Sequence, residues 1–230
     1  MRASDIYFVN YGSCEIVAGR CAHYFPPHFH HSDCLISLTS GRLDIVLANR
    51  KMSLNPGEKA FIPRLTSHAL CPVDGESYSY ITMCFSKDLC LGQKTDEPPL
   101  EAELTPSDDR HKFSGRGYQH KAAEFIAKHQ DFFDLKAVCD HCHVSKFHLI
   151  RQFRRCFGLT PHQYFDNLRI GKIRQGLLSG EHLSDLAYCL GFADQSHMCR
   201  TFKKYMAVTP LQFKKSYLFH PKAGEKTANM

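Results

Sequence analysis

The segment Pro26–Cys34 gathers side chains of the kind that bind transition metals. It reads Pro-Pro-His-Phe-His-His-Ser-Asp-Cys. In an extended strand the side chains alternate between faces, so His28 and His30 point the same way, and Cys34 shares that parity if no bulge intervenes. Imidazole and thiolate are borderline-to-soft ligands that suit zinc, nickel, cobalt or copper. The segment therefore predicts a metal site or, alternatively, polar residues that line an organic-ligand pocket or a barrel mouth.

A repeat in the second half of the chain indicates contact with nucleic acid. With a shift of 49 positions, Arg151 falls on Arg200 and Phe153 falls on Phe202, while upstream of these helices the offset is 48. Under the same shift Arg154 and Arg155 match Lys203 and Lys204, and Thr160-Pro161 matches Thr209-Pro210. Each copy has a short apolar helix, a tight turn and a helix with a basic and polar outer face. This pattern predicts two helix-turn-helix units.

Capping residues indicate where the helices of this half begin. Ser145 is a good N-cap for the second helix of the first unit. Thr160 followed by Pro161 opens a long helix towards Leu178, because proline is favoured at the first helical position. In the second copy, the corresponding helix is predicted from about Asp194 to Tyr205.

The first half of the chain has the pattern of strands. Short apolar or alternating segments are separated by turn signals such as Asn55-Pro-Gly57. The segments are Cys14–Cys21, Cys34–Leu38, Leu43–Ala48, Glu58–Ile62 and Tyr78–Phe85. Their regular spacing predicts a small barrel or sandwich. Residues 94–117 are polar and rich in turn formers, which is typical of a linker.

The charge is distributed unevenly along the chain. Residues 118–220 carry 15 Lys and Arg against 8 Asp and Glu, whereas residues 1–117 carry 12 against 14. A basic half joined to a near-neutral half is typical of a polyanion-binding domain attached to a domain that need not touch nucleic acid.

The cysteines and the apolar segments bear on the location of the protein. The chain has 11 cysteines scattered through apolar segments. No secretory signal precedes them, so we expect reduced, buried thiols rather than a disulfide framework. Cys139-x-x-Cys142 resembles a metal or redox motif, but Cys139 is expected on a buried helix face. No apolar run approaches membrane-spanning length. We expect a cytoplasmic protein without membrane contact.

Two motifs in the first half resemble those of the cupin barrel. The first is the His28-x-His30 segment, and the second is Gly57-Glu-Lys-Ala-Phe-Ile-Pro63 followed by His68. In metal-binding cupins these motifs supply three histidines and a glutamate. His28, His30 and His68 match the histidines, while Cys34 stands at one of the two positions allowed for the missing glutamate. The resemblance implies that these four residues hold an effector or a divalent transition metal, namely zinc, nickel, cobalt or copper.

The repeated helical region resembles the DNA-binding domain of AraC-family transcription regulators. The most specific stretch is Leu186–Phe213, which carries the family's Gly-Phe, Arg-x-Phe-Lys and Thr-Pro pattern. The first copy departs at His143, where the family usually has a turn glycine. Together with the cupin-like region, the resemblance implies an α+β protein in which a cupin-like β-barrel precedes an all-α domain with two helix-turn-helix units.

The same resemblance implies which side chains face DNA. They are Lys146, Phe147, Ile150 and Arg151 in the first unit, and Gln195, Ser196, Cys199 and Arg200 in the second. Arg151 and Arg200 are suited to base contacts because arginine binds guanine bidentately. Arg154, Arg155, Lys203 and Lys204 are expected to contact phosphates, although a solvated basic face is the alternative.

The sequence thus predicts a regulator that binds double-stranded DNA under the control of an effector. The predicted parts are a cupin-like regulatory domain over residues 1–93, a linker over 94–117, a DNA-binding domain over 118–220 and a tail over 221–230. A homodimer and contact with RNA polymerase are expectations of the family. We expect no enzyme activity. Two alternatives stay open: a metal-dependent cupin enzyme tethered to a DNA-binding domain, and a regulator that binds DNA without a ligand.

Overall fold

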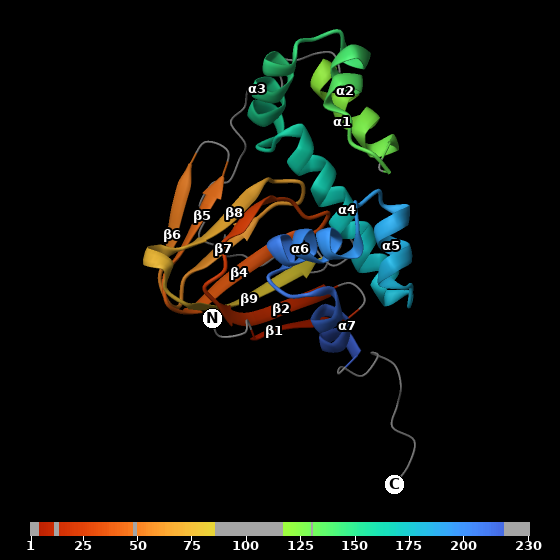
Figure 1. The fold of residues 1–230 in the computed structure, drawn as a ribbon. Helices are drawn as coiled ribbons and strands as arrows, with labels where there is room; N and C mark the ends of the chain where they lie inside the picture. The colour runs from red at the N-terminus through yellow and green to blue at the C-terminus, as the bar shows by residue number, and fades with distance from the viewer. Residues whose placement is uncertain (1–4, 12–13, 48–49, 86–116, 130, 219–230) are drawn as a thin grey trace.

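A strand-rich half is followed by a helical half (Figure 1), which confirms the predicted α+β class. The computed structural model describes residues 5–11, 14–47, 50–85, 117–129 and 131–218 of the 230-residue chain. The described strands are β1 (Asp5–Asn10), β2 (Cys14–Cys21), β3 (Phe25–His28), β4 (Asp33–Ser40), β5 (Leu43–Leu47), β6 (Lys51–Leu54), β7 (Lys59–Ile62), β8 (His68–Pro72) and β9 (Tyr78–Phe85).

The strands form two antiparallel sheets with the order β1-β2-β9-β4-β7 and β3-β8-β5-β6. Side chains from the facing surfaces of the sheets form the core of this strand-rich half, with Ile36, Leu43, Ile45 and Tyr78 each at most 1% exposed. Alternation along a strand explains this packing, because every second side chain of β4 and β9 is buried. The predicted bounds of β2 and β9 are confirmed.

The helices are α1 (Tyr118–Lys128), α2 (Leu135–Cys142), α3 (Lys146–Phe157), α4 (Pro161–Leu178), α5 (Leu183–Cys189), α6 (Gln195–Met206) and α7 (Pro210–Leu218). The predicted caps are confirmed. Ser145 Oγ accepts a hydrogen bond from the His148 amide, and Thr160 forms a reciprocal capping box with Gln163 ahead of Pro161. Both helix-turn-helix units, α2–α3 and α5–α6, are therefore present where the repeat predicted them.

The turns of the two units each contain a residue in the left-handed backbone region, but the residue type differs. His143 ends α2 in the left-handed region with φ +54°, and Gly191 follows α5 with φ +63°. A Cβ on Gly191 would lie 1.5 Å from the carbonyl oxygen of Asp131, so this position requires glycine. The first turn has room for a side chain on its left-handed residue, which accounts for the departure at His143.

Two apolar cores divide the helical half unequally. One core surrounds Leu149 and Phe153 of α3 and belongs to the first unit. The second unit, with Met198 and Phe202 of α6, shares one continuous core with the sheets. The second helix of the second unit, α6, is therefore packed as part of the strand-rich half. The second helix of the first unit, α3, belongs to a separate core. We call α3 and α6 the recognition helices.

The long helix α4 connects these cores. Its Phe165 packs in the first core, and Ile173 and Leu177 pack in the shared core. The guanidinium of Arg169 lies 3.2 Å from the ring centroid of Phe192, which precedes α6. Through these contacts α4 fixes the spacing between the two units.

The predicted domain limits fall largely outside the described residues. The limit at residue 93, the linker up to residue 116 and the tail over 221–230 lie there, while α1 begins at Tyr118. Among the helices that the structure describes, none has the length and apolar character needed to cross a bilayer.

Candidate effector cavity and nucleic-acid interface

His28, His30 and His68 converge at one end of the smaller sheet. His28, at the end of β3, lies directly opposite His68, at the start of β8, and His30 follows two residues later. One ring nitrogen from each histidine can be chosen so that all three lie within 4.8 Å of one another. The structure therefore brings together the three histidines that the cupin-like motifs singled out.

Hydrogen bonds orient two of these imidazoles. Nδ1 of His28 lies 2.8 Å from the carbonyl oxygen of Pro26, and Nδ1 of His68 lies 3.0 Å from that of Thr66. A carbonyl oxygen can only accept, so Nδ1 carries the proton in both rings and Nε2 keeps its lone pair. This is the tautomer found in metal-binding histidines, whose other nitrogen donates to a backbone carbonyl or a carboxylate.

The protonation state also fits a metal site. Burial lowers the pKa of His28, and it lowers the pKa of His68 to about 3. The pKa of His30 falls well below its usual range because of burial and the adjacent His28 and His68. The three imidazoles are thus neutral at neutral pH, and neutral imidazole is the form that binds zinc, nickel, cobalt or copper.

Cys34 lies outside the histidine cluster. The parity prediction fails because β3 ends at His28 and the chain bends at His31 and Ser32 before β4 begins. The Cys34 thiol instead donates a hydrogen bond to Sγ of Cys84 at 3.0 Å. Cys84 lies directly opposite Cys34, on β9. This hydrogen bond and burial raise the pKa of the Cys84 thiol. The pairing of β4 with β9 brings Cys84 opposite Cys34, a contact that the sequence alone does not indicate.

The histidine cluster opens into a cavity of about 800 Å³, the interdomain cavity. The strands supply apolar walls that include Phe8, Val17, Phe25, Ile36, Leu70 and Tyr80, and Cys34 and Cys84 also border it. The helical half supplies Asn167, Leu168, Ile170, Gly171 and Arg174 from α4, and Tyr205 and Met206 from α6. Sequence reasoning missed the helical wall, because no local signal indicates which helix faces the sheets.

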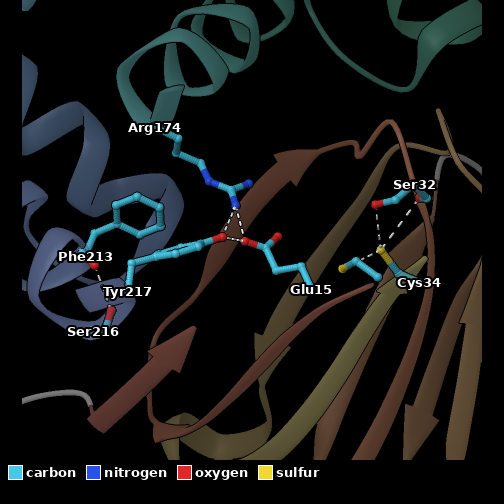
Figure 2. A network of polar contacts seen from close by, with 8 residues as sticks. Glu15, Ser32, Cys34, Arg174, Phe213, Ser216 and Tyr217 are labelled. Carbon is cyan, nitrogen blue, oxygen red and sulfur yellow. Dashed lines mark hydrogen bonds and ion pairs between the residues drawn. The ribbon is translucent and has the colours of Figure 1, made fainter. Parts of the chain in front are cut away.

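A polar network joins the two halves beside the cavity (Figure 2). The guanidinium of Arg174 on α4 forms an ion pair with Glu15 on β2, and the Tyr217 hydroxyl on α7 donates to the same carboxylate. The side chains of Arg174 and Glu15 are 27% and 19% exposed. Nε of Arg174 is buried and has no hydrogen-bond partner among the described residues. The network therefore ties α4 and α7 to the larger sheet.

Further contacts fix the helices to the segments on either side of β3. The His23 Nε2–H donates to the carbonyl oxygen of Lys204 near the end of α6 at 2.8 Å. Phe29 stacks on Tyr164 of α4 with 5.5 Å between ring centroids. The recognition helix α6 is thus held at its C-terminal end by the strand-rich half.

The predicted DNA-facing residues of α3 lie on one face of the helix. Lys146, Phe147, Arg151, Arg154 and Arg155 are exposed, with Phe147 at 85%, and Ile150 is half-buried. Phe147, Ile150 and the three arginines line one surface hollow. Leu149 and Phe153 point into the core on the opposite face. An exposed phenylalanine between arginines is available for contact with a base edge, for example a thymine methyl.

The corresponding face of α6 is also exposed. Gln195, Ser196, Arg200, Lys203 and Lys204 are exposed, and Cys199 is half-buried. Oδ1 of Asp194 caps the helix by accepting from the His197 amide at 2.6 Å.

Cys139 and Cys142 on α2 are buried, and burial raises the pKa of both thiols, which matches inert core cysteines.

Comparison with known proteins identifies the helical half. Residues 138–216 match a family described as a helix-turn-helix domain. The transcriptional activator RhaS of Escherichia coli is 36% identical over 75 residues, which cover 32% of this chain and 27% of RhaS. The match over residues 138–216 therefore identifies a helix-turn-helix domain in the helical half. A second relative is YbfI of Bacillus subtilis, named an uncharacterized helix-turn-helix-type transcriptional regulator, which is 22% identical over 76% of this chain and 81% of its own length.

A solved structure shares the fold over most of the chain. ToxT from Vibrio cholerae matches with a TM-score of 0.53 and 14% identity, over 90% of this chain and 99% of its own. The order of a strand-rich half followed by a helical half is therefore shared with ToxT. At this identity the likeness concerns the fold alone.

We predict that the ion pair of Arg174 stabilises the joint between the two halves. Arg174→Met leaves the Glu15 carboxylate partly buried without its cation, so the free energy of unfolding should fall by about 1–3 kcal/mol. Urea denaturation measures this loss. Arg42→Met is the matched control, because Arg42 pairs with Asp74 at the surface, where both side chains are more than half exposed. The control should cost less than about 1 kcal/mol, and an equal loss in both variants would contradict the assignment.

Proposed function

We propose that this protein is a sequence-specific DNA-binding transcription regulator controlled by an effector that occupies the interdomain cavity. The observation that carries the proposal is the composition of the cavity wall. Sensor strands form one side, and α4 and the recognition helix α6 form the other. A molecule that fills the cavity touches the helices that position DNA-contacting side chains.

The two recognition helices supply the DNA-binding part of the proposal. Arg151 and Arg200 occupy equivalent positions of the repeat, and both are exposed. Arginine on a recognition helix reads guanine through two acceptors in the major groove. The flanking Arg154, Arg155, Lys203 and Lys204 are exposed on the same helices, where phosphate contacts fix the register of the helix in the groove.

The control by an effector follows from differential binding. A ligand shifts a conformational equilibrium only when it binds one state more tightly than the other. The contacts between a bound effector and the cavity wall change when α4 or α6 moves relative to the sheets. An effector therefore favours the arrangement of α6 that completes its cavity. It thereby changes the affinity for DNA by a coupling free energy, and DNA changes the affinity for the effector by the same amount.

The chemistry of the walls narrows the class of effector. His28, His30 and His68 form a neutral nitrogen donor set that fits zinc, nickel, cobalt or copper, and a bound ion would supply a fixed positive charge at the wall. The remaining walls are largely apolar and suit an organic molecule. ToxT has been solved with (E)-4-(8-methylnaphthalen-1-yl)but-3-enoic acid, an apolar ring system with a carboxylate. We propose that an ion at the histidines, an organic ligand in the cavity, or both act as the effector.

We predict that Arg151 and Arg200 carry the sequence discrimination. In the Arg151→Ala/Arg200→Ala variant, the preference for a duplex selected with the wild-type protein over a scrambled duplex should fall by about 1–3 kcal/mol per lost arginine contact. Fluorescence anisotropy with both duplexes measures the preference. Lys203→Ala/Lys204→Ala should instead weaken binding to both duplexes alike, because phosphates carry no sequence.

A remote cation serves as the control for the DNA experiment. Arg42→Ala removes an exposed arginine of the strand-rich half, which pairs with Asp74. It should leave both affinities unchanged. Unaltered discrimination in the double arginine variant would overturn the proposed role of these helices.

We predict that the histidine cluster binds a divalent transition metal. Addition of zinc, nickel, cobalt or copper to chelator-treated protein should raise the melting temperature, since binding to the native state alone contributes about 2.7 kcal/mol at a hundredfold excess over the dissociation constant. Metal emission spectroscopy should give one ion per chain. The His28→Ala/His68→Ala variant should lose both the ion and the stabilisation.

His31→Ala is the matched control for the metal experiment. His31 borders the same cavity but lies outside the cluster, so this variant should keep its ion. Full metal stoichiometry in His28→Ala/His68→Ala would refute the proposed ligands. If none of the four ions binds, a melting-temperature screen of organic acids, sugars and amines tests the cavity itself.

A further inference from the structure

Two buried thiols lie against each other on the wall of the interdomain cavity. Cys34 on β4 and Cys84 on β9 are directly opposed across antiparallel strands, and their Sγ atoms lie 3.0 Å apart. The two residues are 1% and 6% exposed, yet both border the cavity. A small molecule that enters the cavity therefore meets both sulfur atoms at once. We call Cys34 and Cys84 the cavity dithiol.

The cavity dithiol has polar neighbours on both sides and an apolar neighbour along its strand. Glu15 on β2 lies directly opposite Cys84, so Glu15, Cys84 and Cys34 stand side by side across three neighbouring strands. The hydroxyl oxygen of Ser32 lies 3.9 Å from the Cys34 sulfur (Figure 2). Ile36, two residues along β4, also borders the cavity. A ligand held by the two sulfur atoms thus has one hydroxyl and an apolar wall within reach.

The surroundings of the cavity dithiol disfavour reactions that need a thiolate. The hydrogen bond from Cys34 and burial raise the pKa of the Cys84 thiol, and the negative charge of Glu15 adds to this effect. Thiolate is the form that binds transition-metal ions and attacks disulfides, and redox-sensing cysteines have a lowered pKa. A ligand that suits this pair must instead react with neutral thiols and leave an uncharged product, because a buried net charge is costly.

Trivalent arsenic meets both requirements. Arsenous acid and organic arsenic(III) dihydroxides are uncharged at neutral pH, and each condenses with two thiols. Two As–O bonds break, two As–S bonds form, and each thiol proton leaves in a water molecule. Arsenic stays trivalent, so the step needs no oxidant or reductant, and the product is neutral. Pyramidal arsenic also holds its two sulfur atoms close together, as the 3.0 Å pair already is, whereas mercury(II) prefers two sulfur atoms on opposite sides of the ion.

We infer that the cavity dithiol binds trivalent arsenicals, with arsenic bridging Sγ of Cys34 and Sγ of Cys84. The third substituent on arsenic is a hydroxyl group in the inorganic form and an alkyl or aryl group in the organic form. The cavity of about 800 Å³ has room for either, and its largely apolar walls favour the organic group. Binding to the cavity dithiol stands by itself, whereas an effect of the bound arsenical on DNA affinity rests on the proposed function.

The binding test uses the reduced full-length chain with two probes, arsenite and phenylarsine oxide, which is present in water as the dihydroxide. A wash with a monothiol removes arsenic held by one sulfur atom, whereas two thiols on one chain hold it as a chelate. Mass spectrometry of the intact protein should then give one arsenical per chain. Phenylarsine oxide should bind about tenfold more tightly than arsenite, or better, because the ring is buried against apolar walls. Equal affinities would assign the site to the inorganic form.

Paired serine variants locate the bound arsenic. Cys34→Ser/Cys84→Ser removes both sulfur atoms of the cavity dithiol and should abolish the adduct. Cys139→Ser/Cys142→Ser is the matched control, because Cys139 and Cys142 form another buried pair on α2, where the Cys142 thiol donates to the carbonyl oxygen of Tyr118 at 3.5 Å. The control should keep one arsenical per chain. An adduct that survives in the cavity variant, or disappears in the control, would overturn the inference.

Peptide mapping of the wild type answers the same question if the cavity variant fails to fold, as judged by circular dichroism. After proteolysis of the phenylarsine oxide complex, the peptides joined through arsenic should contain Cys34 and Cys84. Arsenic on any other pair of cysteines, or no bound arsenic at all, would contradict the inference.

A measurement of DNA affinity separates this inference from the proposed function. With one phenylarsine group on the cavity dithiol, the affinity for a selected duplex should change by about fivefold or more. The affinity of Cys34→Ser/Cys84→Ser should not respond to the probe. Full occupancy of the cavity dithiol with unchanged DNA affinity would support the arsenical site and contradict the proposed control of DNA binding by the cavity.

Discussion

The ion pair between Arg174 and Glu15 joins the helical half to the larger sheet. It lies where α4 crosses the larger sheet, next to the hydroxyl of Tyr217 and the apolar core shared by both halves. A partly buried pair of this kind contributes specificity of position as much as stability, because either charge alone would be costly to bury. This ion pair holds α4 against the larger sheet, and α4 connects the two helix-turn-helix units.

The two units consequently differ in their coupling to the sensor half. The core of α3 is separate, whereas α6 shares its core with the sheets and ends at the hydrogen bond between Lys204 and His23. In the proposed function, an effector in the interdomain cavity acts first on the residues of α6 and α4 that line it. The first unit then follows α4 through Phe165 and Tyr164. In the proposed function, the contents of the cavity therefore influence the second unit directly, and the first unit through the spacing that α4 sets.

The helices of the repeat could be predicted from the sequence because their signals are local. Ser145, Thr160 and Asp194 cap helices within three residues, so no distant contact is needed to place them. The histidine cluster was predicted through its resemblance to known motifs, whereas Cys34 lies outside the cluster because strand parity does not survive the bend after β3, although it borders the same cavity. The strand β3 itself was missed: it contains two prolines, which an edge strand tolerates. The helical wall of the cavity depends on long-range packing and left no local pattern.

A larger side chain on α4 can test directly whether the contents of the cavity set DNA binding. Gly171 on α4 borders the cavity, and a Cβ built there meets no heavy atom within 4 Å. Gly171→Leu therefore adds an apolar side chain at the border of the cavity where we place the effector, while Gly171→Ala controls for the gain in helix propensity. The affinity for a selected DNA duplex, measured without added effector, should differ between the two variants by about fivefold or more. Equal affinities in two folded variants would contradict the claim that the contents of the cavity set DNA binding.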